Sequence, residues 1–324
     1  MRTEPTTQPL MSCDLHVHSR FSGAVNLPVL RRVGYECYSE PREVYAEARR
    51  RGMDLVTLTD HDSIEGAVEL LSLPGTFVSE EATVELPGGR QLHLGVYDVS
   101  EAQHERISRL RTDAESLFAY LAEQRVATAV NHLFSALTGP RDVADFEWAL
   151  GNVSHVEIQN GMMPAATNGF ARRAAQNAGL CSVGGSDAHT LPSVARAYTS
   201  VPGARTREEF LDGLRQGRCA AGGESGSYAR LTADVARVFA GGYAWNVQRA
   251  LDGPREAVVL ACMLALVPVL PLIPLVTAAL HLRELAFAER FFRRFETAPA
   301  SARRPRPRPA SGPLATPLVL ESGR

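Results

Sequence analysis

Residues 12–19 place three side chains that can bind a metal ion on one face of a predicted strand. The segment reads Ser-Cys-Asp-Leu-His-Val-His-Ser, so Asp14, His16 and His18 alternate with apolar residues. Successive side chains of a strand point to opposite faces, and Leu15 and Val17 therefore pack behind the other three. Two neutral imidazoles on one strand suit Zn, Mn or Fe, but further ligands would have to come from elsewhere. The alternative is an ordinary strand that carries two histidines, and the rest of the sequence must decide.

Strands and helices alternate through the next two hundred residues. The apolar run 55–59 ends in Asp60-His61-Asp62, and it follows a helix expected to begin after Ser39 and to stop at Gly52. Strand, helix and strand with polar residues at the strand end is typical of a parallel sheet. Further strands are expected at 76–85, 91–99, 126–130, 153–159, 180–183, 196–201 and 219–221, and helices at 101–124, 165–178 and 206–216. This alternation predicts an α/β fold with a closed or nearly closed β/α barrel.

The composition excludes several classes of protein. The chain has 324 residues, is 45% hydrophobic and carries a net charge of -2, which favours a globular core and excludes a broad basic surface for nucleic acid. Since it contains no lysine, Schiff-base and P-loop lysine chemistry are excluded. The five cysteines are scattered without a CxxC pair, and the polar N-terminus lacks the apolar core of a secretory signal. We therefore expect a protein of a reducing compartment, the cytoplasm.

The composition changes after about residue 228. Residues 257–280 carry no charge and are long enough to cross a bilayer, but Pro268, Pro271 and Pro274 would break a helix there. More arginines follow this segment than precede it, which would place the N-terminal part outside the cytoplasm if the segment spanned a membrane. We favour a proline-broken helical element that packs against the barrel, a partner or a membrane face, and a true span stays the alternative. The Arg/Pro-rich tail 299–324 is expected to be disordered.

Six of the nine histidines lie at or near the ends of predicted strands, together with two acidic residues. The exceptions are His104, His155 and His281. Because active sites of β/α barrels assemble at the carboxyl ends of the strands, we expect the strand-end residues to converge on one metal site. The candidate ligands are His16, His18, His61, Glu81, His93, His132, Asp187 and His189.

The motifs that carry these residues resemble the polymerase and histidinol phosphatase (PHP) superfamily of metal-dependent phosphoesterases. They are Asp14-Leu15-His16-Val17-His18-Ser19, Thr59-Asp60-His61-Asp62, Glu81-Ala82-Thr83, Leu92-His93-Leu94, Asn131-His132 and Gly185-Ser186-Asp187-Ala188-His189. The resemblance covers residues 12 to about 221 and implies a distorted (β/α)7 barrel at 12–227. An N-terminal arm (1–11) would precede this barrel, and a helical extension (228–298) and the tail would follow it.

The resemblance also implies a cluster of two or three divalent metal ions. One ion would take His16, His18, Glu81 and Asp187 as ligands. A second would share Glu81 as a bridge and add His93 and His132. A third would take His61 and His189.

The chain departs from the family pattern at Gly23. The family usually has another ligand, Asp or His, a few residues after the His-x-His pair, and glycine has no side chain to offer. The third ion would then be weakly bound, absent or completed by a nearby carboxylate such as Asp62 or Glu36. Either Glu80 or Glu81 could be the ligand on this strand, but not both, since neighbours on a strand face opposite ways. We choose Glu81 because the Glu-Ala-Thr run fits the family pattern better.

Four further residues are candidates for supporting roles. Asp14 and Asp60 could accept hydrogen bonds from ligand imidazoles, or could simply be structural carboxylates at strand ends. Arg196 could bind a phosphate group in bidentate fashion, or could form a salt bridge at the rim. Asn160 could line the pocket or turn the chain.

The predicted activity is hydrolysis of a small phosphorylated metabolite or nucleotide by a metal-bound water. Two cations can neutralise the phosphoryl oxygens, activate the water and stabilise the leaving oxygen. The first alternative is a non-catalytic or regulatory metal-binding module that docks a partner or a membrane through 257–280. The second is hydrolysis of a C–N bond, which related metal barrels also perform.

Overall fold

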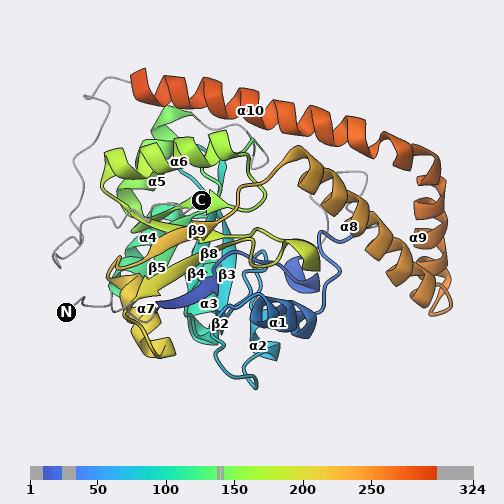
Figure 1. Cartoon of the computed structure of the whole chain (residues 1–324), viewed down its shortest axis with the longest axis horizontal. Coiled ribbons are helices and arrows are strands. Elements are labelled where there is room, and N and C mark those ends of the chain that lie inside the picture. Colours follow the sequence, from blue (N-terminus) through green and yellow to red (C-terminus); the bar gives the residue numbers. More distant parts are fainter. Residues whose placement is uncertain (1–9, 24–33, 137–138, 140–141, 298–324) are drawn as a thin grey trace, which may run out of the picture.

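The computed structural model describes residues 10–23, 34–136, 139 and 142–297. Two β-sheets lie at its centre, with helices packed around them and a helical C-terminal part along one side (Figure 1). The predicted tail 299–324 lies outside the described residues, as does most of the predicted N-terminal arm.

Nine strands make up the two sheets within the described part of the chain. The first sheet has the order β2-β1-β8-β9, and the second has the order β3-β4-β5-β6-β7. In the first, β1 is parallel to β2 and antiparallel to β8. In the second, β3, β4 and β5 are antiparallel neighbours, whereas β5, β6 and β7 are parallel. The strands are β1 (Leu10–Asp14), β2 (Leu55–Val56), β3 (Ser79–Glu85), β4 (Gln91–Tyr97), β5 (Ala127–Val130), β6 (His155–Asn160), β7 (Cys181–Gly185), β8 (Ala197–Pro202) and β9 (Ala220–Gly223).

The expected (β/α)7 barrel is therefore wrong. A closed barrel of this kind needs parallel strands joined by crossovers, but β3 and β4 form a direct hairpin, and β8 is antiparallel to both its neighbours. No continuous ladder joins the two sheets among the described residues, and the backbone pairing between them is by isolated bridges such as Val17 with Ala188 and His61 with Glu81.

Side chains replace ladder hydrogen bonds where a barrel would have closed. The hydroxyl of Thr59 accepts from the backbone N–H of Val17 at 2.9 Å and donates to its carbonyl at 3.2 Å. Thr199 does the same for Gly184, at 2.8 Å in each direction. At Val17 the backbone N–H of Thr59 also donates to the carbonyl, at 2.9 Å, so side-chain and backbone hydrogen bonds together join the segments there.

Seven helices surround the sheets before residue 220 in the described chain: α1 (Pro41–Arg50), α2 (Glu65–Glu69), α3 (Glu101–Leu110), α4 (Ala114–Glu123), α5 (Val143–Asn152), α6 (Ala165–Ala178) and α7 (Arg207–Arg215). The single helix expected at 101–124 is two helices, because Asp113 caps α4 by accepting from the N–H of Ser116. The cap of α1 is Glu40 rather than Ser39, and Pro41 takes the first helical position. Helix α6 ends as expected, at Gly179 in the left-handed conformation.

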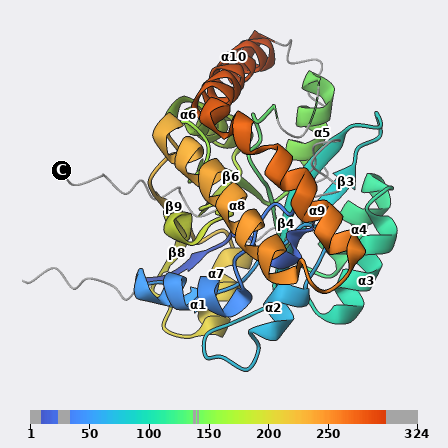
Figure 2. The ribbon, with the colours of Figure 1, turned by 90° about the vertical axis from the view of Figure 1, so that its right-hand side faces the viewer.

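The C-terminal helices leave the body of the protein and then return to it (Figures 1 and 2). Helix α8 (Tyr228–Arg249) is followed by α9 (Pro254–Ala265), the 3-10 helix η4 (Val267–Leu272) and α10 (Ile273–Thr297). The end of α10 packs on α5 and α6, where the Phe291 ring stacks on Phe146 at 4.1 Å and the Phe292 ring stacks on Phe170 at 4.6 Å. Buried aromatic pairs of this kind anchor the returning helix.

The apolar segment 257–280 is not buried against the body, and that part of the expectation is wrong. The helix breaks at η4, as the prolines predict, but Val258, Leu264 and Leu275 are 61%, 53% and 69% exposed. Residues Val267–Glu296 are long and apolar enough to cross a membrane by length and composition, and only 11% of the window is buried.

Candidate metal centre

The eight candidate ligands come together at one place, although they come from six different strand regions. His16 and His18 follow β1, and His61 follows β2. Glu81 lies in β3 and His93 in β4, while His132 follows β5. Asp187 and His189 follow β7. The imidazole rings form a continuous set, with centroids 5.1 Å apart for His16 and His18, 4.3 Å for His18 and His189, and 5.1 Å for His93 and His132.

Glu81 lies at the middle of this cluster and is fully buried. Its Oε2 atom faces His16 Nε2 at 3.3 Å, His18 Nε2 at 3.6 Å and His61 Nδ1 at 3.1 Å. Its Oε1 atom faces His93 Nδ1 at 3.3 Å and His132 Nε2 at 3.2 Å. The two oxygens of one carboxylate thus divide five imidazoles into two groups.

Glu80 points the other way, as the alternation of strand β3 requires. Its Oε2 lies 2.9 Å from Nδ1 of His104, which belongs to helix α3. The structure therefore places Glu81, and not Glu80, in the cluster.

Asp187 provides the second carboxylate at the same place. Its Oδ1 atom lies 3.5 Å from His16 Nε2 and 3.3 Å from His18 Nε2. Its backbone φ is 53°, and that of His132 is 29°, values that L-residues rarely adopt. Backbone strain of this kind clusters at functional sites, because surrounding contacts must hold it in place.

The buried atoms of the cluster fit a cation. Within the described residues, Nε2 of His16, Nε2 of His18, Nδ1 of His61, Nδ1 of His93 and Oε2 of Glu81 are buried without a hydrogen-bond partner. Buried polar atoms without partners cost free energy, and divalent cations bound on the two sides of Glu81 would satisfy them. Four overlapping groups have ligand atoms within 4.8 Å of one another: His18, His61 and His189; His16, His132 and Asp187; His16, His18 and Glu81; His61, Glu81 and His93.

Protonation states agree with this interpretation. Burial and the nearby His189 lower the pKa of His18 to about 3, so its ring is neutral, which is the form that binds metals. Burial would raise the pKa of Glu81, but His16 and His61 hold it well below its usual value. Burial would lower the pKa of His61, whereas Glu81 and Glu36 raise it to about 9. A cation bound there would displace the proton from His61.

Glu157 is a functional candidate that the sequence analysis missed. It is 2% exposed on β6, and its Oε1 lies 2.8 Å from Nδ1 of His16. Its Oε2 accepts from the backbone N–H of His132 at 2.7 Å and from Nδ2 of Asn160 at 2.9 Å. Such a carboxylate fixes the tautomer and orientation of a ligand imidazole. The signal in the sequence was the alternation of His155, Glu157 and Gln159 with apolar residues on a buried strand.

Asp14 and Asp60 do not accept hydrogen bonds from ligand imidazoles, as one interpretation had required. Asp14 accepts from the backbone N–H of His16 at 3.2 Å, of Ser186 at 2.8 Å and of Ala195 at 2.7 Å. Asp60 accepts from the N–H of Ser19 at 2.6 Å and from its hydroxyl at 2.7 Å. Both carboxylates hold the backbone next to the ligands, which is the structural alternative.

Asn160 and Arg196 lie in different surroundings. Asn160 is fully buried, and its Nδ2 donates to Oδ2 of Asp187 at 3.1 Å in addition to Oε2 of Glu157. It therefore orients both carboxylates, of which Asp187 is a candidate ligand. Arg196 is a half-buried residue that pairs with Glu224 at 3.1 Å and donates to the carbonyl of Pro192. Its surroundings fit the salt bridge better than a phosphate contact.

Asp62 and Glu36 are the two carboxylates that could supply the ligand missing at Gly23, and their surroundings differ. Asp62 accepts from the N–H of Thr83 at 2.8 Å and pairs with Arg111. Glu36 lies beside the cluster, with Oε2 3.3 Å from Nε2 of His61.

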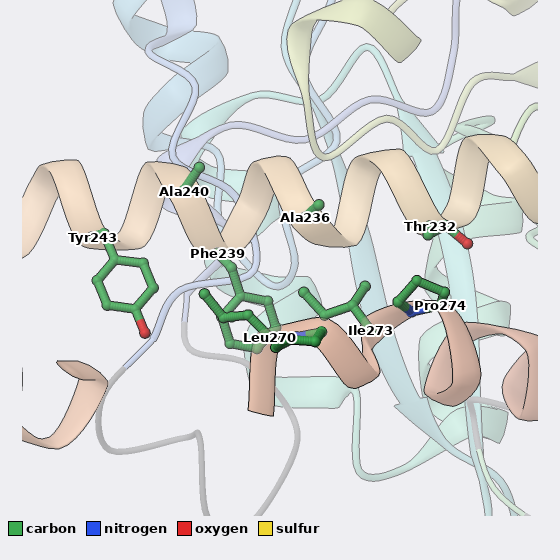
Figure 3. A pocket seen from close by; sticks show the side chains of 9 residues that line it. Thr232, Ala236, Phe239, Ala240, Tyr243, Leu270, Ile273 and Pro274 are labelled. Atoms are coloured by element: carbon green, nitrogen blue, oxygen red, sulfur yellow. The ribbon is translucent and has the colours of Figure 1, made fainter. Parts of the chain in front are cut away.

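Two cavities lie near the helical extension. One of about 240 Å³ opens between His189 and α8, and its lining includes Tyr38 and Arg237. The other, of about 420 Å³, lies between α8 and the chain from η4 into α10, and apolar side chains such as Phe239 and Leu270 line it (Figure 3). The second cavity shares no lining residue with the metal cluster.

Comparison with known proteins gives two sequence matches, each over a part of the chain. A family model described as PHP-associated matches residues 165–219. The uncharacterized protein MJ1587 of Methanocaldococcus jannaschii is 34% identical over 67 residues, which are 21% of this chain. The match spans 38% of the length of that relative.

Two solved structures show weak likeness. The first is PsfC from Pseudomonas syringae PB-5123, with 19% identity, a TM-score of 0.45 and coverage of 73% of this chain and 97% of that one. The second is a Bifidobacterium adolescentis protein described as a "putative metal-dependent phosphoesterase", with 14% identity, a TM-score of 0.39 and coverage of 57% and 90%. Because both TM-scores are below 0.5, neither structure decides the family of this chain. Residues 165–219 match the PHP-associated family model, and the motifs in the rest of the sequence resemble the polymerase and histidinol phosphatase superfamily.

Proposed function

We propose that this protein is a metal-dependent phosphoesterase that hydrolyses a small phosphorylated metabolite or nucleotide. The observation that carries the proposal is the buried Glu81 carboxylate, whose two oxygens face separate groups of imidazoles that have buried nitrogens without partners. Buried polar groups are otherwise satisfied in folded proteins, so this arrangement favours a site for cations over a structural network.

We assign the ligands by the two sides of Glu81. His16, His18, Glu81 and Asp187 would hold one cation, because Oδ1 of Asp187 and Oε2 of Glu81 both lie beside these two imidazoles. Glu81, His93 and His132 would hold the second. Imidazole and carboxylate ligands together suit Zn, Mn or Fe.

Bound cations at these positions would supply positive charge to the phosphoryl oxygens and lower the pKa of water. The chain's own residues hold the site in shape. Glu157 orients His16, and Asn160 orients Asp187. In hydrolysis of a phosphomonoester, water adds to phosphorus and the alcohol leaves, so the products are an alcohol and inorganic phosphate. A diester gives an alcohol and a phosphomonoester, which a phosphatase added to the assay converts to phosphate.

The surroundings favour a small substrate. The cavity beside His189 has a volume of about 240 Å³, and Arg237 is the cationic residue among those that line it. The chain carries a net charge of -2, whereas a protein that binds long nucleic acids needs a broad basic surface.

Removal and return of metal test the proposal. After treatment with a chelator, the protein should release no phosphate from a panel of phosphomonoesters and diesters, and Mn, Zn or Fe should restore release from at least one of them. Phosphate is measured colorimetrically, with metal content measured on the same samples. Protein that holds two or more ions but releases phosphate from no member of a broad panel would contradict the proposal.

A second candidate is a non-catalytic metal-binding module that docks another surface. The exposed apolar residues of the helical extension favour docking. Tight metal binding without turnover would support this candidate, so the same experiment separates the two.

A further inference from the structure

Glu36 brings a carboxylate to two histidines that the cations on either side of Glu81 do not use. Its Oε2 lies 3.3 Å from Nε2 of His61 and 3.7 Å from Nε2 of His189. His18, which we assign to the first cation, borders this group, and its ring stacks on His189 at 4.3 Å and on His61 at 4.8 Å. Ligand atoms of His18, His61 and His189 lie within 4.8 Å of one another.

The backbone explains how Glu36 reaches this place. Its N–H donates to the carbonyl of Gly23 at 3.1 Å, so the chain returns to the position where a side chain is missing. Gly23 has a φ of 87°, which disfavours any residue with a side chain. A residue thirteen positions later in sequence therefore supplies the carboxylate that position 23 lacks.

Asp62, the other carboxylate that could complete this site, already has two partners. Asp62 accepts from the N–H of Thr83 at 2.8 Å and pairs with Arg111. We propose that Glu36, with His61 and His189, forms a third site for a divalent cation of the Zn, Mn or Fe class. The inference rests on the proposed function and deepens it by naming the ligand that replaces the side chain absent at Gly23.

Metal content measures this site independently of activity. Wild-type protein, loaded and dialysed, should hold three ions per chain by elemental analysis. Glu36→Gln, which keeps the shape and removes the charge, and Glu36→Ala should each hold two. Asp62→Asn is the matched control and should keep three.

Two results would overturn the third site and leave the proposed function standing. One is a wild-type protein that holds no more than two ions while it releases phosphate. The other is a Glu36→Ala protein that holds as many ions as the wild type. Because the Glu36 side chain is 18% exposed, circular dichroism should show both variants folded.

A different observation concerns residues 247–282, which we call the apolar arm. Among the described residues, fourteen large hydrophobic side chains are exposed, and ten of them lie in this arm. They are Val247, Leu251, Val258, Leu264, Val267, Val269, Leu272, Leu275, Val276 and Leu282. Helix α9 lies at the right-hand edge of the molecule in Figure 1, and Figure 2 turns this side toward the viewer. Exposed apolar surface on this scale marks a binding surface for a membrane or a protein.

The charge of the sequence that follows the apolar arm favours a membrane over a protein as its binding partner. Beyond Thr297 the sequence has arginines at 303, 304, 306 and 308 and no acidic residue before Glu321. An apolar segment that is followed in the sequence by clustered arginines favours anionic lipid headgroups. The break at η4 with Pro271 inside it disfavours a straight helix across a bilayer. We infer that the arm docks on an anionic membrane surface and lies in it without spanning it.

Vesicle binding tests this inference on the full chain. Vesicles of phosphatidylcholine with phosphatidylserine should sediment the protein, and higher salt or phosphatidylcholine alone should weaken binding. The double variant Val258→Glu with Leu275→Glu should bind the mixed vesicles at least about tenfold more weakly, since both side chains would enter the lipid. Leu71→Glu, at a site 51% exposed on the body, is the matched control and should bind as the wild type does.

The alternative occupant is a second copy of the chain. A protein that is dimeric by light scattering, becomes monomeric in the double variant and does not sediment with mixed vesicles would overturn membrane docking.

Discussion

Replacing Glu81 with Gln should lower phosphate release by about 10³-fold, because the loss of one bridging charge removes several kcal/mol of stabilisation from the reacting centre. Both oxygens of this carboxylate face imidazoles, and a neutral amide cannot bridge two cations in the same way. The metal content of the variant should fall as well. Steady-state phosphate release and elemental analysis measure the two effects.

The neighbouring residue provides the matched control for this change. Glu80 lies on the same strand and faces His104 instead of the cluster. Glu80→Gln should therefore keep its metal content and most of its activity. If Glu81→Gln kept wild-type metal content and activity, the assignment of Glu81 as the bridge would be wrong.

Replacing Glu157 with Gln should weaken metal binding by about 10- to 100-fold, the usual effect of losing a carboxylate that orients a ligand. If the amide oxygen still accepts from His16, the amide NH2 group faces the N–H of His132 and Nδ2 of Asn160, and both of these donors lose their acceptor. Neutral Gln also removes the negative charge that makes His16 a stronger ligand. Metal affinity is measured by competition with a chromogenic chelator.

A purely structural role for Glu157 predicts a different outcome. The melting temperature in excess chelator would fall, and the metal affinity of the folded protein would not change. Gln159→Ala, on the same strand and bonded to Ser225 instead of a ligand, is the control that should keep wild-type affinity.

The sequence by itself determined the parts of this protein that depend on local rules. The period of two along residues 14–18 brought His16 and His18 to one side, and both reach Glu81. Strand alternation also separates Glu80 from Glu81, although the sequence could not say which of them faced inward. The end of α6 at Gly179 and the break at the prolines of η4 follow from backbone conformations of one or a few residues.

Only the tertiary structure decided how distant segments pair. The barrel was expected because strands alternated with helices, yet β3 and β4 pair as a hairpin and β8 is antiparallel to both its neighbours. Glu36 and Glu157 act on histidines far away in sequence, and nothing within a few residues of either one identifies its partner.

The physical reason is the range of the interactions involved. Helix caps, turn conformations and side-chain alternation act over a few residues, so a single sequence contains them in full. Burial and hydrogen bonding between segments depend on which groups compete for the same partner in the folded chain, and the exposed apolar arm shows that hydrophobicity alone does not choose between the core and a surface.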